Sequence, residues 1–90
     1  MARIDSAVKI PRNLNGLELA KKLEFFGYAI TRQSGSHMRL SRKVNNITQH
    51  LTIPAHKPLR IGTLRQILKD VSGQIGIDLH ELIEMLVDTI

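Results

Sequence analysis

A chain of 90 residues, 42% of them hydrophobic and 23% charged, is long enough for one small globular domain. The absence of cysteine excludes disulfides, and no apolar run approaches the roughly 20 residues that a membrane-spanning helix needs. The net charge of +5 indicates a polyanionic partner such as nucleic acid. We therefore expect one soluble, cytoplasmic domain over residues 1–90, with an irregular segment over residues 1–13.

The first predicted element is a helix that begins after Asn15. An asparagine is a favourable N-cap, and Glu18 stands three residues later, as a capping box requires. Gly27 is placed to end the helix in the left-handed conformation. The apolar residues expected on the buried face of this helix are Leu17, Ala20, Leu23 and Phe26.

Three strands are predicted next, over residues 28–33, 37–43 and 47–53. Polar and apolar side chains alternate along them, as in strands with one buried face. The Gly/Ser residues at 34–36 and the Asn pair at 45–46 are typical of tight turns. Because connections this short join antiparallel neighbours, we expect an antiparallel meander.

The two sides of the middle strand differ in character. Met38 and Leu40 are apolar and point one way, whereas His37, Arg39 and Ser41 point the other way. Helices that flank such a sheet should cover its apolar side. We therefore expect the side that carries His37 to stay open to solvent.

Two further helices are predicted after the sheet. Thr63 is the expected N-cap of the first, with Gln66 as its box partner and Gly73 at its end. The second is an acidic C-terminal helix over residues 78–90, with Asp78 at its start. The order is therefore α-β-β-β-α-α. This is an α+β fold with helices on one face of a three-stranded antiparallel sheet.

Charge is distributed unevenly along the chain. Residues 25–69 contain eight Lys or Arg, three of the four histidines and no Asp or Glu, whereas residues 70–90 contain five acidic residues and no Lys or Arg. A merely solubilising surface mixes both signs, so the acid-free stretch favours a surface that binds a polyanion. The candidate phosphate-binding residues are Arg32, Arg39, Arg42, Lys43, Lys57 and Arg60.

His37 is the first candidate for chemistry, because it begins a strand directly after the Gly/Ser turn and can exchange a proton near neutral pH. The alternative is a surface histidine without a role. If the last two strands pair, His56 comes near His37; otherwise it only helps to order its loop. His50 is expected in mid-strand on the open side, and His80 is expected to be solvated on the last helix.

Several other chemistries are poorly supported. A zinc site needs three or four ligands at set spacing, which these histidines do not supply without cysteine. A magnesium-dependent nuclease needs clustered carboxylates, and residues 25–69 contain none. The aromatic residues lie together within residues 25–28, so a base-stacking platform across the sheet is not expected. We expect no metal and no cofactor.

Several segments of the chain resemble, in order and spacing, the HicA mRNA-interferase toxins. These segments are residues 23–28 at the first helix end, Arg32-Gln33-Ser34-Gly35-Ser36-His37, Thr52-Ile53-Pro54-Ala55-His56, Gly62-Thr63-Leu64 and Ile67-Leu68-Lys69. The resemblance implies a fold like that of double-stranded-RNA-binding domains. It also implies a metal-independent ribonuclease whose catalytic histidine is His37, and a HicB-type antitoxin that covers the site. The acidic helix over residues 78–90 departs from the family pattern.

The residues and the resemblance together predict an endoribonuclease toxin that cleaves mRNA by transesterification. His37 would take a proton from an RNA 2′-OH, and His56 or water would protonate the leaving oxygen. The residues expected to bind the RNA are Ser36, Arg39, Arg42, Lys43 and Lys57. Two alternatives stay open: a non-catalytic RNA-binding module, and a protein-binding subunit whose acidic tail is the interface.

Overall fold

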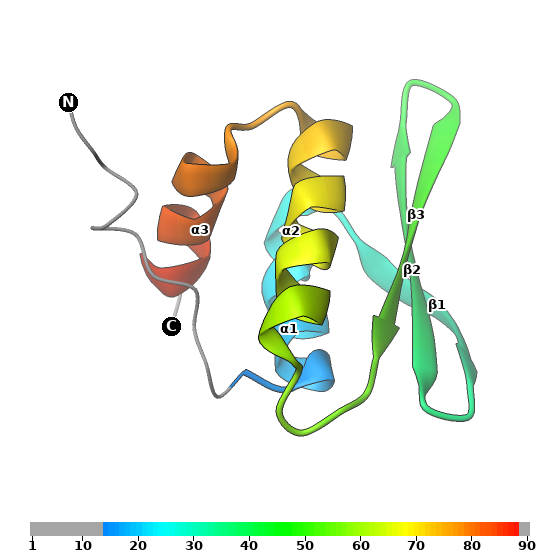
Figure 1. The fold of residues 1–90 in the computed structure, drawn as a ribbon. Helices are drawn as coiled ribbons and strands as arrows, with labels where there is room; N and C mark the ends of the chain where they lie inside the picture. Colours follow the sequence, from blue (N-terminus) through cyan, green and yellow to red (C-terminus); the bar gives the residue numbers. More distant parts are fainter. Residues whose placement is uncertain (1–13, 89–90) are drawn as a thin grey trace, which may run out of the picture.

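The computed structural model describes residues 14–88, so the segment predicted to be irregular, residues 1–13, lies outside the described part. The elements are α1 (Gly16–Leu23), a short 3₁₀ helix η2 (Glu24–Phe26), β1 (Ala29–Ser34), β2 (His37–Val44), β3 (Ile47–Pro54), α2 (Ile61–Ile75) and α3 (Leu79–Asp88). The predicted order and the α+β class are confirmed. Figure 1 shows α1 and α2 against one side of the sheet, α3 beyond them, and the other side of the sheet uncovered.

The strands form an antiparallel sheet in the order β1-β2-β3, so β2 is the central strand. Gly35 has a φ of 58°, which suits the first central position of a type II′ hairpin turn and which glycine adopts without strain. Asn45 and Asn46 have φ values of 51° and 70°, as a type I′ turn requires. The predicted meander and both predicted turns are therefore confirmed.

Alternation along the strands gives the sheet two faces. The covered face packs against the helices and consists of Met38, Leu40, Arg42, Gln49, Leu51 and Ile53. The open face points to solvent and consists of Thr31, Arg32, His37, Arg39, Ser41, Lys43, Thr48, His50 and Thr52. The predicted division of β2, with Met38 inside and His37 outside, is confirmed.

The start of α1 also follows the prediction. Asn15 Oδ1 accepts the backbone N–H of Glu18 at 2.8 Å, while the N–H of Asn15 donates to Glu18 Oε1 at 2.9 Å. Gly27, with a φ of 96°, ends the helical segment after η2. The predicted buried stripe is wrong at Leu17, which is 44% exposed, whereas Leu19 is fully buried. The reason is that α2 and α3 both pack on the side of α1 that carries Leu19.

Both ends of α2 differ from the prediction. The helix begins at Ile61, and its N-cap is Arg60 rather than Thr63, without a side-chain capping bond. Gly73 lies inside the helix, which ends only at Gly76, where φ is 75°. The helix is therefore longer at both ends than its local signals indicate.

Contacts with distant parts of the chain explain the extra length of α2. Before the helix, the buried Leu59 donates its N–H to Leu14 O at 2.9 Å, which fixes the chain where α2 starts. Near its end, the Gln74 side chain accepts a hydrogen bond from Tyr28 OH at 2.6 Å and donates one to His50 O at 2.9 Å. These bonds offset the roughly 1 kcal/mol that a glycine costs inside a helix.

The last helix, α3, is part of the core. Asp78 stands at its start, as predicted, and its carboxylate accepts the backbone N–H of His80 at 3.0 Å. Leu82, Ile83 and Leu86 are buried against the rest of the molecule, and Leu79 is partly buried against it. None of the helices within residues 14–88 is long and apolar enough to cross a membrane.

Candidate functional site

His37 stands at one end of the central strand. It follows the Gly35-Ser36 turn and pairs with Ser34 of β1 on one side and with Pro54 of β3 on the other. Its side chain is exposed on the open face. An imidazole in this position can meet a large ligand, because none of the helices described within residues 14–88 covers this face (Figure 1).

The end of the sheet at the β1–β2 turn is braced by main-chain hydrogen bonds. The N–H of Ala55 donates to Ser36 O at 2.6 Å, and the N–H of Gly16 donates to His56 O at 3.0 Å. A Cβ atom at Gly16 would lie 1.9 Å from Pro54 O, so only glycine fits at this contact. These contacts fix the turn, the start of α1 and the β3–α2 loop relative to one another.

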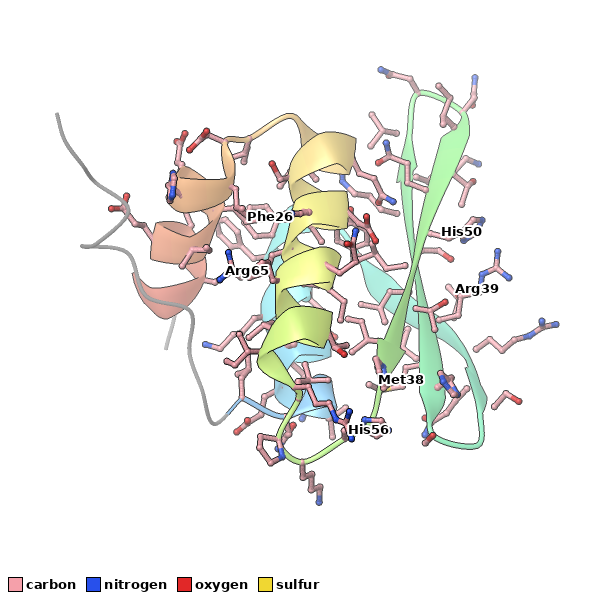
Figure 2. All side chains as sticks on the ribbon, in the orientation of Figure 1. Phe26, Met38, Arg39, His50, His56 and Arg65 are labelled. Carbon is pink, nitrogen blue, oxygen red and sulfur yellow. The ribbon has the colours of Figure 1, made fainter. Side chains whose placement is uncertain are left out.

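A hydrogen-bonded cluster lies in the middle of the open face. Ser41 Oγ is 2.9 Å from His50 Nδ1 and 3.0 Å from Thr31 Oγ1. Arg39 Nε donates to the same His50 nitrogen at 3.4 Å. Figure 2 shows Arg39 and His50 projecting from the side of the sheet that faces away from the helices. The contact holds the Arg39 guanidinium over the sheet and leaves its outer N–H groups for a ligand.

The sequence placed His50 on the open face but gave it no role. Its contact with Ser41 follows from the β2–β3 register, in which these two residues are direct partners. A register of this kind could be read from the two-residue Asn45-Asn46 turn, because the turn fixes which residues face each other.

Positive charges also meet on the open face. Arg32 and Arg39 are direct cross-strand partners, an arrangement of like charges that normally costs stability. No Asp or Glu stands on any strand, and the carboxylates of residues 14–88 all lie in helices or at their starts. An anion bound between the two guanidinium groups would remove the repulsion. Lys43 lies on the same face, toward the β2–β3 turn.

Arg42 lies on the covered face, apart from the other candidate phosphate-binding residues. Its Nε donates to Phe26 O at 2.9 Å, its Nη1 donates to Gln49 Oε1, and its guanidinium carbon lies 5.9 Å from the centre of the Tyr28 ring. Burial raises the pKa of the Tyr28 hydroxyl; the charge of Arg42 opposes this rise, and that of Asp70 adds to it. Arg42 therefore joins the sheet to the end of the first helical segment.

His56 and Lys57 line a surface hollow of about 160 Å³ next to the end of the covered face. The rest of its lining comes from Asn15, Leu17, Gln33, Met38 and Ala55. Figure 2 shows His56 at the same end of the sheet as Met38. Strand pairing thus brings His56 to the end where His37 lies, as expected. Because His37 and Met38 alternate, however, the hollow and the His37 ring lie on opposite sides of β2.

The other candidates are spread around this end of the molecule. Ser36 is exposed in the turn beside His37, and Arg60 is exposed at the start of α2. Within residues 14–88, no three His, Asp or Glu side chains gather in a way that could hold a metal ion. The candidate site therefore comprises His37, its turn and the basic open face. The hollow lies at the same end of β2, on the opposite side of the strand.

Comparison with known proteins shows to which family the chain belongs. A family model described as HicA toxin of bacterial toxin-antitoxin matches residues 16–72, well over half of the chain. The chain belongs to the HicA toxin family. It is therefore the toxin of a toxin–antitoxin system and has a cognate antitoxin as its partner. Searches of curated proteins and of solved structures returned no match.

The family match includes the braced turn, the open face and the hollow, apart from Asn15 at its edge. It ends within α2, so α3 lies outside it. This HicA toxin nevertheless uses α3 to complete its core through Leu82, Ile83 and Leu86.

Proposed function

We propose that this HicA toxin is an endoribonuclease, an mRNA interferase, that cleaves RNA in the cytoplasm with His37 as the catalytic base. The observation that carries the proposal is the position of His37, an exposed imidazole on a face where the strands bear the Arg32–Arg39 pair and, among residues 14–88, no carboxylate. Alternate residues on a strand are about 7 Å apart, so Arg39 stands next to His37 on this face. RNA offers a phosphate to the guanidinium groups and a 2′-hydroxyl to the imidazole.

The proposed chemistry is a transesterification. Neutral His37 takes the proton of a 2′-OH, whose oxygen attacks the adjacent phosphorus. The P–O5′ bond breaks, which yields a 2′,3′-cyclic phosphate and a 5′-OH. Arg39, held by His50, stabilises the negative charge that develops on the phosphorane oxygens. Because His56 lies on the other side of β2, we assign the proton for the leaving 5′-oxygen to water.

The experiment that tests this function is His37→Ala. We expect RNA cleavage to fall by roughly 10²–10⁴-fold and growth inhibition to disappear, while the circular dichroism spectrum stays unchanged. Thr48→Ala is a matched control, because it removes an exposed side chain of the same face near the opposite end of the sheet. Undiminished cleavage by His37→Ala would disprove the assignment. RNA retention without cleavage by the unaltered protein would favour a non-catalytic RNA-binding module.

The fragment ends give a second test of the mechanism. The 5′ fragments should end in a 2′,3′-cyclic phosphate and the 3′ fragments should begin with a 5′-OH, which mass spectrometry distinguishes. Cleavage should persist in EDTA, because His37 rather than a metal-bound water generates the nucleophile. Activity that is lost in EDTA and restored by magnesium would contradict this mechanism.

We further propose that the cognate antitoxin is of the HicB type and covers the open face, with acidic side chains in the positions of phosphates. RNA and antitoxin then bind in a mutually exclusive way. The His37→Ala protein allows the test without cleavage, since loss of one exposed ring should leave antitoxin affinity within about tenfold. Antitoxin should displace a fluorescent RNA from it. A ternary complex that retains all the RNA would show that inhibition follows another route.

A further inference from the structure

The hollow beside the end of β2 has no part in the chemistry proposed above. It lies where the start of α1, the ends of β1 and β2, and the β3–α2 loop meet, and its volume is about 160 Å³. Its apolar lining comes from Leu17, Met38 and Ala55. Its polar lining comes from Asn15, Gln33, His56 and Lys57.

Much of this lining is not used by the fold. Among the hydrogen bonds and ion pairs within residues 14–88, none involves the side chain of Gln33, His56 or Lys57. Leu17 is 44% exposed although it belongs to the first turn of α1. A single exposed leucine is ordinary, but this one lines a concave site beside an amide and an imidazole that no group among the described residues bonds, which makes the hollow a candidate ligand site.

The size and chemistry of the hollow restrict what can bind in it. A cavity of roughly 150 Å³ accommodates one benzene-sized ring. The exposed part of the apolar lining, chiefly Leu17 with Ala55, suits the flat faces of such a ring, whereas the amide of Gln33 needs a donor and an acceptor on its edge. A bare phosphate would gain nothing from Leu17 and Met38, and an alkyl chain would leave the Gln33 amide unpaired. A nucleobase meets both requirements.

We propose that the hollow binds one nucleobase of the RNA strand, next to the cleaved phosphate, and so gives the toxin a base preference at that position. This inference rests on the proposed function. In it, the His56 ring stacks on the base, Gln33 bonds its edge, and Lys57 pairs with a neighbouring phosphate. His56 is therefore a binding residue in this assignment, and its protons are not used in the reaction.

The RNA can reach both the hollow and His37 by crossing the end of the sheet. Met38 lines the hollow, and its direct neighbour His37 points to the open face, so the two sites are separated only by the width of β2. The Gly35-Ser36 turn between the two sides is uncovered, and a Cβ atom at Gly35 would have no atom within 4 Å. The RNA strand can therefore run from the open face, over the turn, into the hollow.

The proposal is tested with an abasic scan in the His37→Ala background, where RNA stays intact. A short RNA is prepared with the base removed at one position at a time along its length, and its affinity is measured. We expect about a tenfold loss at one position, on the scale of a stacked base. In proteins that also carry Gln33→Ala or His56→Ala, removal of that base should cost little more. Gln66→Ala, which removes an exposed amide from α2, is the matched control and should retain the full loss.

The variant His56→Phe separates stacking from proton transfer in an otherwise unaltered, active protein. A phenyl ring stacks but cannot donate a proton, so we expect it to keep cleavage within about threefold and His56→Ala to raise KM by about tenfold. If His56→Phe and His56→Ala both lower kcat to a similar extent and leave KM unchanged, the residue is an acid and the nucleobase assignment is wrong.

The nucleobase assignment is also wrong if RNA binds or is cleaved but removal of no single base lowers its affinity more than removal of the others. The proposed function fails separately, if the unaltered protein does not cleave RNA. The abasic scan can still be measured in that case, because it requires only that RNA binds. An absence of binding would overturn both.

Discussion

The two faces of the sheet separate stability from the proposed chemistry. Along β2 the exposed His37 and Arg39 alternate with the buried Met38 and with Arg42, whose guanidinium is bonded to Phe26 and Gln49. Arg39 and Arg42 carry the same charge three residues apart, yet one faces solvent and the other joins sheet to helix. The position of a basic residue in the alternation therefore matters as much as its charge, and substitutions on the two faces should have distinct effects.

The largest effect on stability is expected from Met38→Ala on the covered face. Met38 is 1% exposed, so its truncation should lower the free energy of unfolding by about 2–5 kcal/mol in a urea titration. His37→Ala, one residue away on the open face, should change it by no more than about 0.5 kcal/mol. Equal destabilisation by the two changes would show that His37 is a packing residue.

Arg42→Ala should be the next most damaging change. It removes two hydrogen bonds of a charged group and the contact with the Tyr28 ring, so we expect a loss of about 1–3 kcal/mol in unfolding free energy. Arg42→Lys should recover little of it, because lysine lacks the planar fork. RNA affinity of the folded protein should keep its dependence on salt. A stable Arg42→Ala protein with weakened RNA binding would instead place Arg42 on the RNA surface.

Arg39→Ala should show the opposite behaviour. Stability should stay within about 0.5 kcal/mol, whereas the slope of log affinity against log salt should fall by about 0.7, the value for one lost phosphate contact on single-stranded RNA. Arg65→Ala is the matched control, since Arg65 is exposed on α2 and lies on the helix side of the molecule (Figure 2). Equal slopes for Arg39→Ala and the unaltered protein would remove the open face from the RNA-binding surface.

The smallest expected effect is a pH dependence at Tyr28. Burial raises the pKa of its hydroxyl above the ordinary value of 10.0, so the proton is held more tightly in the folded state. The stability that this provides is complete below pH 10 and is lost as pH rises through the folded pKa. Tyr28→Phe lacks the bond to Gln74 and should be about 1 kcal/mol less stable at neutral pH. Urea titrations should show this gap narrowing above about pH 10, and a constant gap would contradict the assignment.

Signals that act within a few residues predicted the fold well. The Asn15–Glu18 capping box and the Asn45-Asn46 turn depend only on local backbone geometry, and both are present. The predicted end of α2 at Gly73 failed because Gln74 is held by Tyr28 and His50, which are distant in the sequence. Local chemistry could not reveal a helix end that is decided by packing.

The candidate site could be predicted from the sequence to about the same extent as the fold. The Gly/Ser turn was sufficient to single out His37 as an exposed strand-end residue, and the structure places it so. The grouping of Arg42 with Arg39 overlooked the two-residue period of the strand. The bond between His50 and Ser41 required the strand register, and the surroundings of His56 required three separate segments to meet. The register could have been inferred from the Asn45-Asn46 turn, whereas the surroundings of His56 arise from tertiary structure alone.

The distribution of carboxylates has a consequence for how the protein meets a polyanion. The exposed Asp78, Glu81 and Glu84 belong to the α3 region, on the far side of the helical layer from the basic open face (Figure 1). Such a separation of charge contributes to an electric dipole moment, on which a polyanion exerts a torque before contact. Encounters then occur preferentially with the basic sheet face turned toward the polyanion, and association is faster than for randomly oriented encounters. This aiming weakens as salt shortens the Debye length to about 8 Å at physiological ionic strength. Residues that never touch the RNA would thus influence how often an encounter succeeds.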